Sequence, residues 1–514
     1  MKKKLYSVQK NSNLSNKVES SIDEKQVEKT EGKGIENLPK MLILFLSSFF
    51  DLDSILNFSS TNKKYRDYFC EMRKIYSLFN QIKISRIFLK ESLSEKKEII
   101  KICLINKDIS NLRNQMGNTP LHYACENEKI SKEMINHFIE YKCHLNMRNL
   151  DKETPLHYAC INEEVSFEII KFFVEKKCDL NIKDYNDNTP LHYACQNENI
   201  SLEIINCLVE NKSDLNSQGY NSYTPLHYGA KKEKISLEII KCLVENKSDL
   251  NLKSESDNTP LHFACKNENI SIEIIQCLIE NRSDINCNNK FDVFYSLHYA
   301  CNNQNISPEI IKCLVENKSD LNSNDYNGNI PLHYACQNEN ISVEIIKCLF
   351  ENKSDLNLKD NFGDTSLHFA CKNENISIEI IKYLVENKSD LNLKNLLEYC
   401  PLHYLCENEN ISLEIIICLV ENKSDLNLKS ESDNTPLHYV CKNENISIET
   451  IKYLVENKSD LNISNNFGKT CFHLVCENKK SSFEIVQFLI ENKADVNSKK
   501  SSKILSHFYQ QKKN

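Results

Sequence analysis

Apolar and polar positions follow one another along most of the chain in a pattern that returns every 35 residues. One copy begins at residues 189–195, with the sequence Thr-Pro-Leu-His-Tyr-Ala-Cys. The histidine of this segment recurs at 35-residue steps, apart from one 36-residue step that ends at His298. Such regularity predicts a chain built from one repeated structural unit. The eleven histidines are His122, His157, His192, His227, His262, His298, His333, His368, His403, His438 and His473.

Each unit is predicted to contain two helices joined by a polar turn. Thr189 is a typical N-cap residue, and Pro190 occupies the first helical position, where its missing N–H is tolerated. The polar segment 196–199 separates this helix from a second one, which Ser201 caps. The unit therefore has the sequence signature of a helix–turn–helix.

The second helix is apolar over more of its circumference than one helical hairpin can bury. Residues 204, 205 and 207–209 are apolar, whereas Glu203, Asn206 and Glu210 form a polar stripe. An apolar face of this width has to be covered by the neighbouring units, as in a solenoid of stacked repeats.

These residues resemble the ankyrin repeat, whose first helix begins Thr-Pro-Leu-His-x-Ala. The resemblance covers residues 115–497 in eleven copies of about 35 residues. It implies an all-α solenoid in which helix–turn–helix units stack side by side and hairpin-like fingers project from one edge. The usual work of this family is the binding of other proteins.

The chain departs from the family pattern in ways that predict weaker units. Two additional residues lie between the helices, and the glycine that usually ends the second helix is replaced, for instance by Lys212. A non-glycine residue is therefore expected in the left-handed conformation, at a cost of about 1 kcal/mol. Some units also lack the helix-starting proline, which Ser296, Ser366 and Cys471 replace.

The segments that flank the repeats have a different character. Residues 1–34 are polar and are expected to be disordered. Residues 35–80 resemble an F-box, a small helical module that docks on the Skp-type adaptor of cullin–RING ubiquitin ligases. Residues 81–114 are predicted to form a degenerate capping repeat, and residues 498–514 a C-terminal cap or tail. The resemblance implies these adaptor-docking residues in the F-box-like module: Leu38, Pro39, Leu42, Phe50, Leu52, Ile55 and Leu56.

Two functions follow from these resemblances. The repeats with an F-box-like module predict the substrate-recognition subunit of an SCF-type ubiquitin ligase, with the target bound on the ankyrin surface. The alternative is a plain ankyrin scaffold, in which residues 35–80 only cover the first repeat with helices.

The composition excludes several other classes of protein. A formal net charge of −8 argues against a nucleic-acid partner, and a hydrophobic content of 40% argues against a wholly disordered chain. The longest apolar run, residues 41–50, is too short to span a membrane. The 23 cysteines include no CxxC pair and follow no signal peptide, which predicts a reduced, cytoplasmic or nuclear protein. We expect it to be monomeric outside its complexes.

The histidines and cysteines of the repeats are interpreted as structural. His192 and Cys195 lie three residues apart on one helix, but stacked helices about 8–10 Å apart cannot place four ligands around a zinc ion. The histidine is expected to hydrogen-bond near the threonine cap, and the cysteine to fill the core. With only 8 glycines and no catalytic motif, the sequence predicts neither a cofactor nor an enzyme.

The finger tips are the predicted target-binding sites, because they differ between repeats whose helices are nearly identical. Several tips carry aromatic or large apolar residues, which are typical anchors of protein interfaces. The alternative is that each aromatic side chain packs on the adjacent finger. The residues concerned are Tyr185, Tyr220, Tyr223, Phe291, Phe294, Tyr295, Tyr326, Phe362, Leu396, Leu397 and Tyr399.

Overall fold

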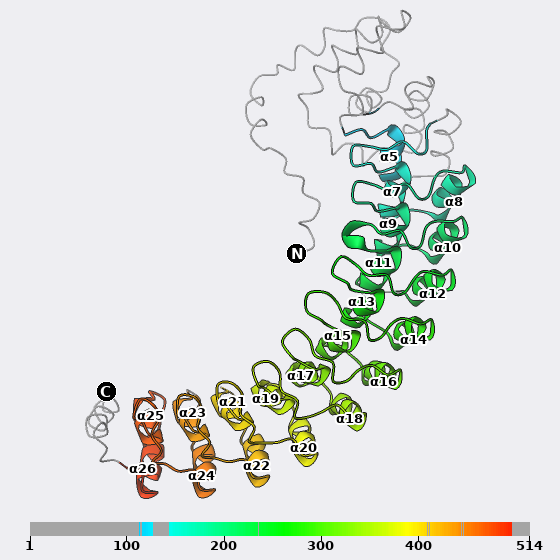
Figure 1. Cartoon of the computed structure of the whole chain (residues 1–514). Coiled ribbons are helices and arrows are strands. Elements are labelled where there is room, and N and C mark those ends of the chain that lie inside the picture. Colours follow the sequence, from blue (N-terminus) through cyan, green and yellow to red (C-terminus); the bar gives the residue numbers. More distant parts are fainter. Residues whose placement is uncertain are drawn as a thin grey trace, which may run out of the picture. The chain divides into compact units, whose positions relative to one another are not determined.

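A computed structural model describes residues 113, 116–126, 143–234, 236–408, 410, 412–443, 445 and 447–495. Within these residues the chain is helical, apart from loops and one isolated antiparallel bridge between Asn288 and Tyr295 (Figure 1). The predicted disordered segment, the F-box-like module with its adaptor-docking residues, and the C-terminal cap lie outside the described residues. The degenerate capping repeat also lies outside them, apart from Arg113.

The first helix of every unit starts at the predicted position and is two turns long. It extends one residue further than predicted, because Gln196 still belongs to the helix that begins at Pro190. The first helices are α5 (Pro120–Glu126), α7 (Pro155–Ile161), α9 (Pro190–Gln196), α11 (Pro225–Lys231), α13 (Pro260–Lys266), α15 (Ser296–Asn302), α17 (Pro331–Gln337), α19 (Ser366–Lys372), α21 (Pro401–Glu407), α23 (Pro436–Lys442) and α25 (Cys471–Glu477).

Each second helix among the described residues follows a serine N-cap, as the sequence predicts. The second helices are α8 (Phe167–Glu175), α10 (Leu202–Glu210), α12 (Leu237–Glu245), α14 (Ile272–Glu280), α16 (Pro308–Glu316), α18 (Val343–Glu351), α20 (Ile378–Glu386), α22 (Leu413–Glu421), α24 (Ile448–Glu456) and α26 (Phe483–Glu491). A short 3-10 helix, η2 (Tyr220–Ser222), lies in the loop before α11.

The chain divides into two compact units, residues 1–214 and residues 215–514, and the layers are alike in each. In the first unit, α5, α7 and α9 pack side by side, and α8 packs against α10. In the second unit, consecutive first helices from α11 to α25 form one layer, and consecutive second helices from α12 to α26 form the other (Figure 1). Hairpin loops project on the side of the first helices, where the fingers were predicted.

The core lies between the two layers and is filled by the predicted apolar positions. Leu332 and Cys336 of α17 are fully buried, as are Ile346 and Leu349 of α18. Burying one such side chain contributes about 1.5–3 kcal/mol. Similar sets recur in the other described repeats, although α11 has Ala230 in place of the cysteine. Burial also raises the pKa of the Cys336 thiol to about 12, so this side chain is a neutral core residue.

The second helices end in a left-handed residue, which confirms the prediction made for Lys212. Its φ is 71°, and the residues at this place in the other repeats have φ between 58° and 77°. The conformation is stabilised across repeats by an asparagine. Asn322 donates from Nδ2 to the carbonyl oxygen of Lys353 at 3.1 Å, and its Oδ1 accepts the Asp355 N–H at 2.9 Å. The left-handed residues are Lys177, Lys212, Lys247, Arg282, Lys318, Lys353, Lys388, Lys423, Lys458 and Lys493.

Candidate protein-binding surface

Most of the described fingers are tight hairpins built around one polar side chain; the finger before α11 has Gly219 at that position. In the finger before α17, Asp325 Oδ1 accepts the N–H groups of Asn327 at 2.8 Å and Asn329 at 2.7 Å. The Asp325 N–H donates to the Asn329 carbonyl oxygen at 2.9 Å and closes the hairpin. Such side-chain turns offer backbone groups a partner within the loop itself. The tip is therefore held in one conformation while its side chains point outward.

Backbone hydrogen bonds join each finger of the second unit to the next. The ladder runs from Lys290 N–H to Ser256 O (3.0 Å), Tyr326 N–H to Asp292 O (2.9 Å), Asn361 N–H to Asn327 O (2.8 Å), Leu396 N–H to Phe362 O (2.8 Å), Glu431 N–H to Leu397 O (3.0 Å) and Asn466 N–H to Ser432 O (3.1 Å). Adjacent tips are therefore fixed in register with one another.

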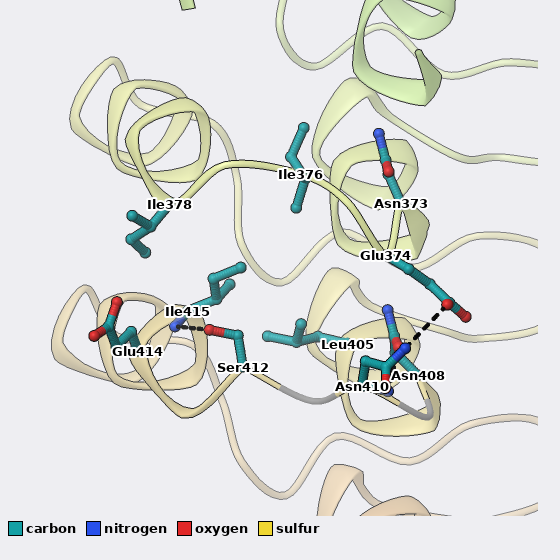
Figure 2. Close-up of a pocket in the computed structure, with 10 residues that line it drawn as sticks. All are labelled: Asn373, Glu374, Ile376, Ile378, Leu405, Asn408, Asn410, Ser412, Glu414 and Ile415. Carbon is teal, nitrogen blue, oxygen red and sulfur yellow. Dashed lines mark hydrogen bonds between the residues drawn. The ribbon is translucent and has the colours of Figure 1, made fainter. Parts of the chain in front are cut away.

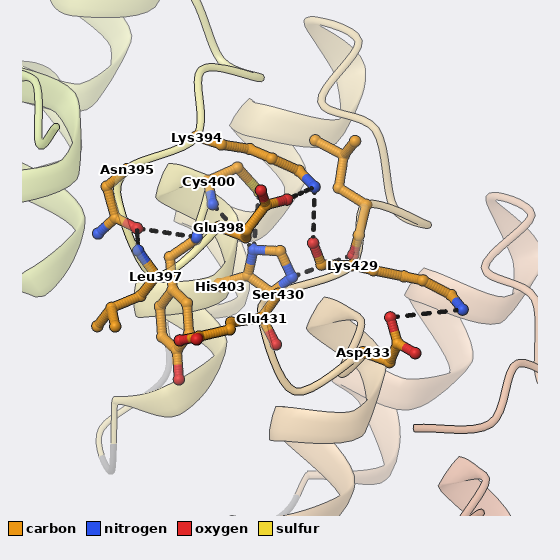
Figure 3. Close-up of polar contacts among 12 residues, drawn as sticks. Lys394, Asn395, Leu397, Glu398, Cys400, His403, Lys429, Ser430, Glu431 and Asp433 are labelled. Carbon is orange, nitrogen blue, oxygen red and sulfur yellow. Dashed lines mark hydrogen bonds and ion pairs between the residues drawn. The ribbon is translucent and has the colours of Figure 1, made fainter. Parts of the chain in front are cut away.

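Lysines at the start of the fingers also form hydrogen bonds to the next finger. Lys359 Nζ donates to the Lys394 carbonyl oxygen at 2.8 Å, and Lys394 Nζ donates to the Lys429 carbonyl oxygen at 2.8 Å. Figure 3 shows that Lys394 also pairs with Glu398 of its own finger, at 2.7 Å. Exposed ion pairs of this kind contribute at most about 1 kcal/mol each, so their main effect is on the position of the loop.

The repeated histidine holds the base of the next finger, that is, the end of the hairpin that leads into the first helix. His368 Nδ1 accepts the Thr365 backbone N–H at 3.0 Å, which places the imidazole proton on Nε2. Nε2 donates to the Tyr399 carbonyl oxygen of the next finger at 3.1 Å. Burial lowers the pKa of His368 to about 4, so the ring is neutral near pH 7. The predicted local bond at the threonine cap is confirmed, but the bond to the next repeat was not foreseen.

Three of the predicted tip aromatics belong to the finger base instead. Phe294 stacks on His298 of its own repeat with ring centroids 5.5 Å apart, and its edge meets Tyr334 of the next repeat at 5.1 Å. Tyr223 and Tyr399 occupy the same place in their repeats: Tyr223 stacks on His227, and Tyr399 lies at a tilt against His403. These three rings therefore pack on first-helix residues of their own and the next repeat, not on the adjacent finger as the alternative interpretation expected.

Tyr295 differs from the other predicted residues because it replaces the threonine cap. Its backbone N–H donates to His298 Nδ1 at 3.2 Å, and its ring lies against the same imidazole, with centroids 5.6 Å apart. The one additional residue of this repeat lengthens the hairpin, so that Asn289 Oδ1 now accepts the Phe294 N–H five residues later. Val293 takes a left-handed φ of 56° in the enlarged turn.

The remaining predicted residues are exposed at the tips. Phe291 is 64% exposed, Tyr326 73%, Phe362 58% and Leu396 71%. Tyr185 of the first unit is exposed as well, and so are Tyr220 and Leu397 of the second. Sequence reasoning missed three exposed apolar residues at the same level of the fingers: Met116 and Leu150 in the first unit and Phe467 in the second. Counting six or seven residues back from each repeated histidine would have found them.

The abundance of asparagine has a structural explanation that the sequence did not reveal. Asn338, which ends α17, donates from Nδ2 to the carbonyl oxygens of Cys301 at 3.1 Å and Asn303 at 2.9 Å in the preceding repeat. Its Oδ1 accepts the Asn340 N–H at 2.9 Å. One side chain thus satisfies several buried backbone groups between repeats, which a shorter or apolar residue cannot do.

A small cavity marks the seam between two repeats, away from the fingers (Figure 2). Its volume is about 230 Å³, below the roughly 300–1,000 Å³ that small-molecule sites usually occupy. Ile376, Leu405 and Ile415 line its apolar part, and Asn410 Nδ2 donates to Glu374 Oε2 across the rim at 3.4 Å. We interpret it as a packing seam rather than as a ligand site.

The described part of the chain contains no group of three or more His, Cys, Asp or Glu side chains that could hold a metal ion. Among the same residues, no helix has the length and apolar character needed to cross a bilayer.

Two layers of paired helices with hairpins along one edge define a helical-repeat protein of the kind that binds other proteins. Ankyrin repeats match residues 129–219, 201–290, 261–360, 297–395, 339–430 and 402–500. The matches cover most of the chain, which therefore belongs to the ankyrin-repeat family. They do not include residues 35–80. No curated protein matches the chain significantly.

Proposed function

We propose that the protein binds a partner protein through the exposed side chains of its finger tips. We call the exposed apolar tip residues of the second unit the tip row: Tyr220, Phe291, Tyr326, Phe362, Leu396, Leu397 and Phe467. The exposure of these side chains on hydrogen-bonded fingers carries the proposal. Large apolar side chains left in water at consecutive, fixed positions are typical of interaction surfaces.

The geometry favours binding because little order has to be created when the partner arrives. The tips are already held by the turn side chains and by the ladder between fingers. A surface that is ordered in advance loses less conformational entropy on association. Aromatic residues such as Tyr326 and Phe362 bury a large area through few rotatable bonds, which suits them as anchors.

The test compares what co-purifies with full-length protein and with a tip variant, Tyr326→Ser/Phe362→Ser/Leu396→Ser, expressed in the source cells. The control carries three exposed substitutions on second helices, Lys312→Ser/Glu351→Ser/Lys382→Ser. We expect the tip variant to lose the main partner while the control keeps it, at equal folded content by circular dichroism. A partner retained equally by all three proteins would contradict the proposal.

We further propose that this protein recruits its partner to a ubiquitin ligase of the cullin–RING type. The support is the sequence of residues 36–70, which begins Leu38-Pro39 and continues with Asp51-Leu52-Asp53. In this proposal Leu38 and Ile55 contact a Skp-type adaptor, and the protein is a cytoplasmic or nuclear monomer outside its complexes. A plain scaffold without a ligase link is the alternative.

Binding of a purified Skp-type adaptor separates these two functions. Full-length protein should bind it, whereas deletion of residues 36–70, or Leu38→Asp with Ile55→Asp, should abolish binding because a charge then enters an apolar contact. Binding of the partner to the tip row should be unchanged. Absence of adaptor binding by the full-length chain would leave the scaffold function.

A further inference from the structure

Two acidic fingers bound the middle part of the tip row, which extends from Phe291 to Leu397. Four consecutive fingers present Phe291, Tyr326, Phe362 and the pair Leu396 and Leu397 to solvent. The fingers on either side of these four both have the tip sequence Ser-Glu-Ser-Asp, at residues 254–257 and 430–433. The ladder of backbone hydrogen bonds joins all six fingers without a break.

The two boundary fingers present carboxylates where their neighbours present rings. Glu255 and Glu431 stand at the tip position that Phe291, Tyr326 and Leu396 occupy, and both are exposed. Each donates its backbone N–H to the preceding finger, but neither carboxylate has a hydrogen bond or ion pair within the described residues. Asp433 faces Lys429 at 3.7 Å, an exposed and weak pair (Figure 3).

Lysines offset only part of the charge of the acidic tips, because Lys429 pairs with Asp433 whereas the described residues give Glu431 no ion pair. The Nζ atoms of Lys359 and Lys394 are directed to carbonyl oxygens of the next finger, at the finger base. Within the apolar fingers, Lys290 and Asp292 flank Phe291 with opposite charges. The surface is therefore apolar in its middle and negative at both ends.

We propose that this surface binds an extended segment of the partner protein that is apolar in its middle and carries Lys or Arg at both ends. The inference rests on the proposed function and specifies the partner's chemistry. Five steps separate the two acidic fingers. At the roughly 8–10 Å between stacked helices, they span about 40–50 Å. An extended chain of about 12–15 residues covers that distance at roughly 3.3 Å per residue.

The charges also argue against a second copy of this chain as the occupant. Two copies that met tip to tip around a two-fold axis would place Glu255 of one copy opposite Glu431 of the other. Like charges facing each other across an interface disfavour association. A basic-ended segment instead meets a carboxylate at each end, and the apolar middle fixes its register.

The test selects peptides from a displayed library of random 16-residue sequences on immobilised full-length protein. The same selection is repeated on a charge-reversed variant, Glu255→Lys/Glu431→Lys. A matched control, Glu351→Lys/Glu386→Lys, makes the same change in net charge at exposed positions near the ends of α18 and α20. Selection on the tip variant Tyr326→Ser/Phe362→Ser/Leu396→Ser tests the underlying surface.

We expect peptides selected on the wild type and on the control to have apolar centres and Lys or Arg at both ends. The charge-reversed variant should bind those peptides at least ten-fold more weakly and should select Asp- or Glu-ended ones. Apolar peptides without a charge preference, lost on the tip variant, would overturn this inference but support the tip row. Binding that survives on the tip variant would overturn both. Self-association of the wild type that the tip variant abolishes would make a second copy the occupant and overturn the inference.

Discussion

The base and the tip of a finger both carry aromatic residues, but the two sets differ in what they contact. Phe294 at the base lies between His298 and Tyr334, whereas Tyr326, at the tip of the next finger, is 73% exposed. Only a few positions along one hairpin separate these environments. An aromatic residue in a variable loop is therefore not by itself a sign of a binding site. Its distance in sequence from the repeated histidine determines whether it lies at the packed base or at the exposed tip.

The comparison also shows how the base supports the tip. The histidine of one repeat holds the base carbonyl of the next finger, as His368 holds Tyr399. Where the base residue is aromatic, its ring lies against the imidazole of its own repeat and contacts an aromatic residue of the next repeat, as Tyr399 contacts His403 and Tyr439. The base is thus packed into the solenoid, and the tip is held in position because the same short hairpin connects it to the base.

The largest expected effect is that of pH on the base histidines. Burial lowers the pKa of His262, His333 and His368 to about 4, against 6.5 for an ordinary histidine. The unfolded chain therefore binds more protons between these values. Stability should be complete above pH 6.5 and should fall as the pH decreases towards 4, by roughly 1.4 kcal/mol per pH unit for each histidine.

Urea denaturation at pH 7.5, 6.0 and 5.0 measures this loss. Burial raises the pKa of the carboxyls of Asp360 and Asp364, so these groups act in the opposite sense and add stability as the pH falls. Asp360→Asn should keep the hairpin, because Asn395 and Asn465 serve at the same position, and should steepen the loss. A midpoint that stays constant or rises from pH 7.5 to 5.0 would show that the histidines are not buried as described.

Removal of one base histidine is the next largest change. His368→Ala deletes the bonds to Thr365 and Tyr399 and leaves a cavity under the finger. The buried donor and acceptor left behind predict a loss of about 3 kcal/mol or more in the free energy of unfolding. The chemical denaturation midpoint provides the measurement, and Tyr326→Ala at a tip is the control, expected within about 0.5 kcal/mol of wild type. Equal loss in both variants would remove the distinction between base and tip.

The same substitution, Phe to Ala, can be made at the base and at the tip of one finger, so that only the position of the residue differs. Phe294→Ala should lower the free energy of unfolding by about 2 kcal/mol, because it removes ring contacts with His298, Tyr299 and Tyr334 together with half-buried area. Phe291→Ala, three residues earlier, should leave stability nearly unchanged while weakening partner binding. Thermal unfolding and co-purification together make the measurement. Stability lost at Phe291, or partner binding that depends on neither residue, would contradict the assignment.

The smallest expected effect concerns the left-handed residues that end the second helices. Lys212→Gly should stabilise the repeat by at most about 1 kcal/mol, because relief at φ 71° is opposed by the greater freedom of glycine in the unfolded chain. Lys347→Gly, in the middle of α18, is the control and should cost about 1 kcal/mol. If Lys212→Gly lowered the denaturation midpoint as much as the control, a left-handed Lys212 would be ruled out.

Much of the fold was determined by the sequence alone, because its signals are local and are repeated many times. The threonine cap with proline at the first helical position sets the start of a helix, as at Thr435 and Pro436. The wide apolar face of the second helix requires a neighbour, and the missing glycine requires a left-handed Lys212. Each of these inferences depends on residues that are close together in the chain.

What only the tertiary structure decided lies between the repeats. The bond from His368 to Tyr399 and the bonds from Asn338 to Cys301 and Asn303 join residues that lie 31 to 37 positions apart. Likewise, Phe294 and Tyr326 are both aromatic loop residues in the sequence, and only the stacking of the next repeat partly covers Phe294 and leaves Tyr326 in water. The physical reason is that periodicity specifies which face of an element is covered, whereas the covering atoms belong to another repeat, whose position depends on packing.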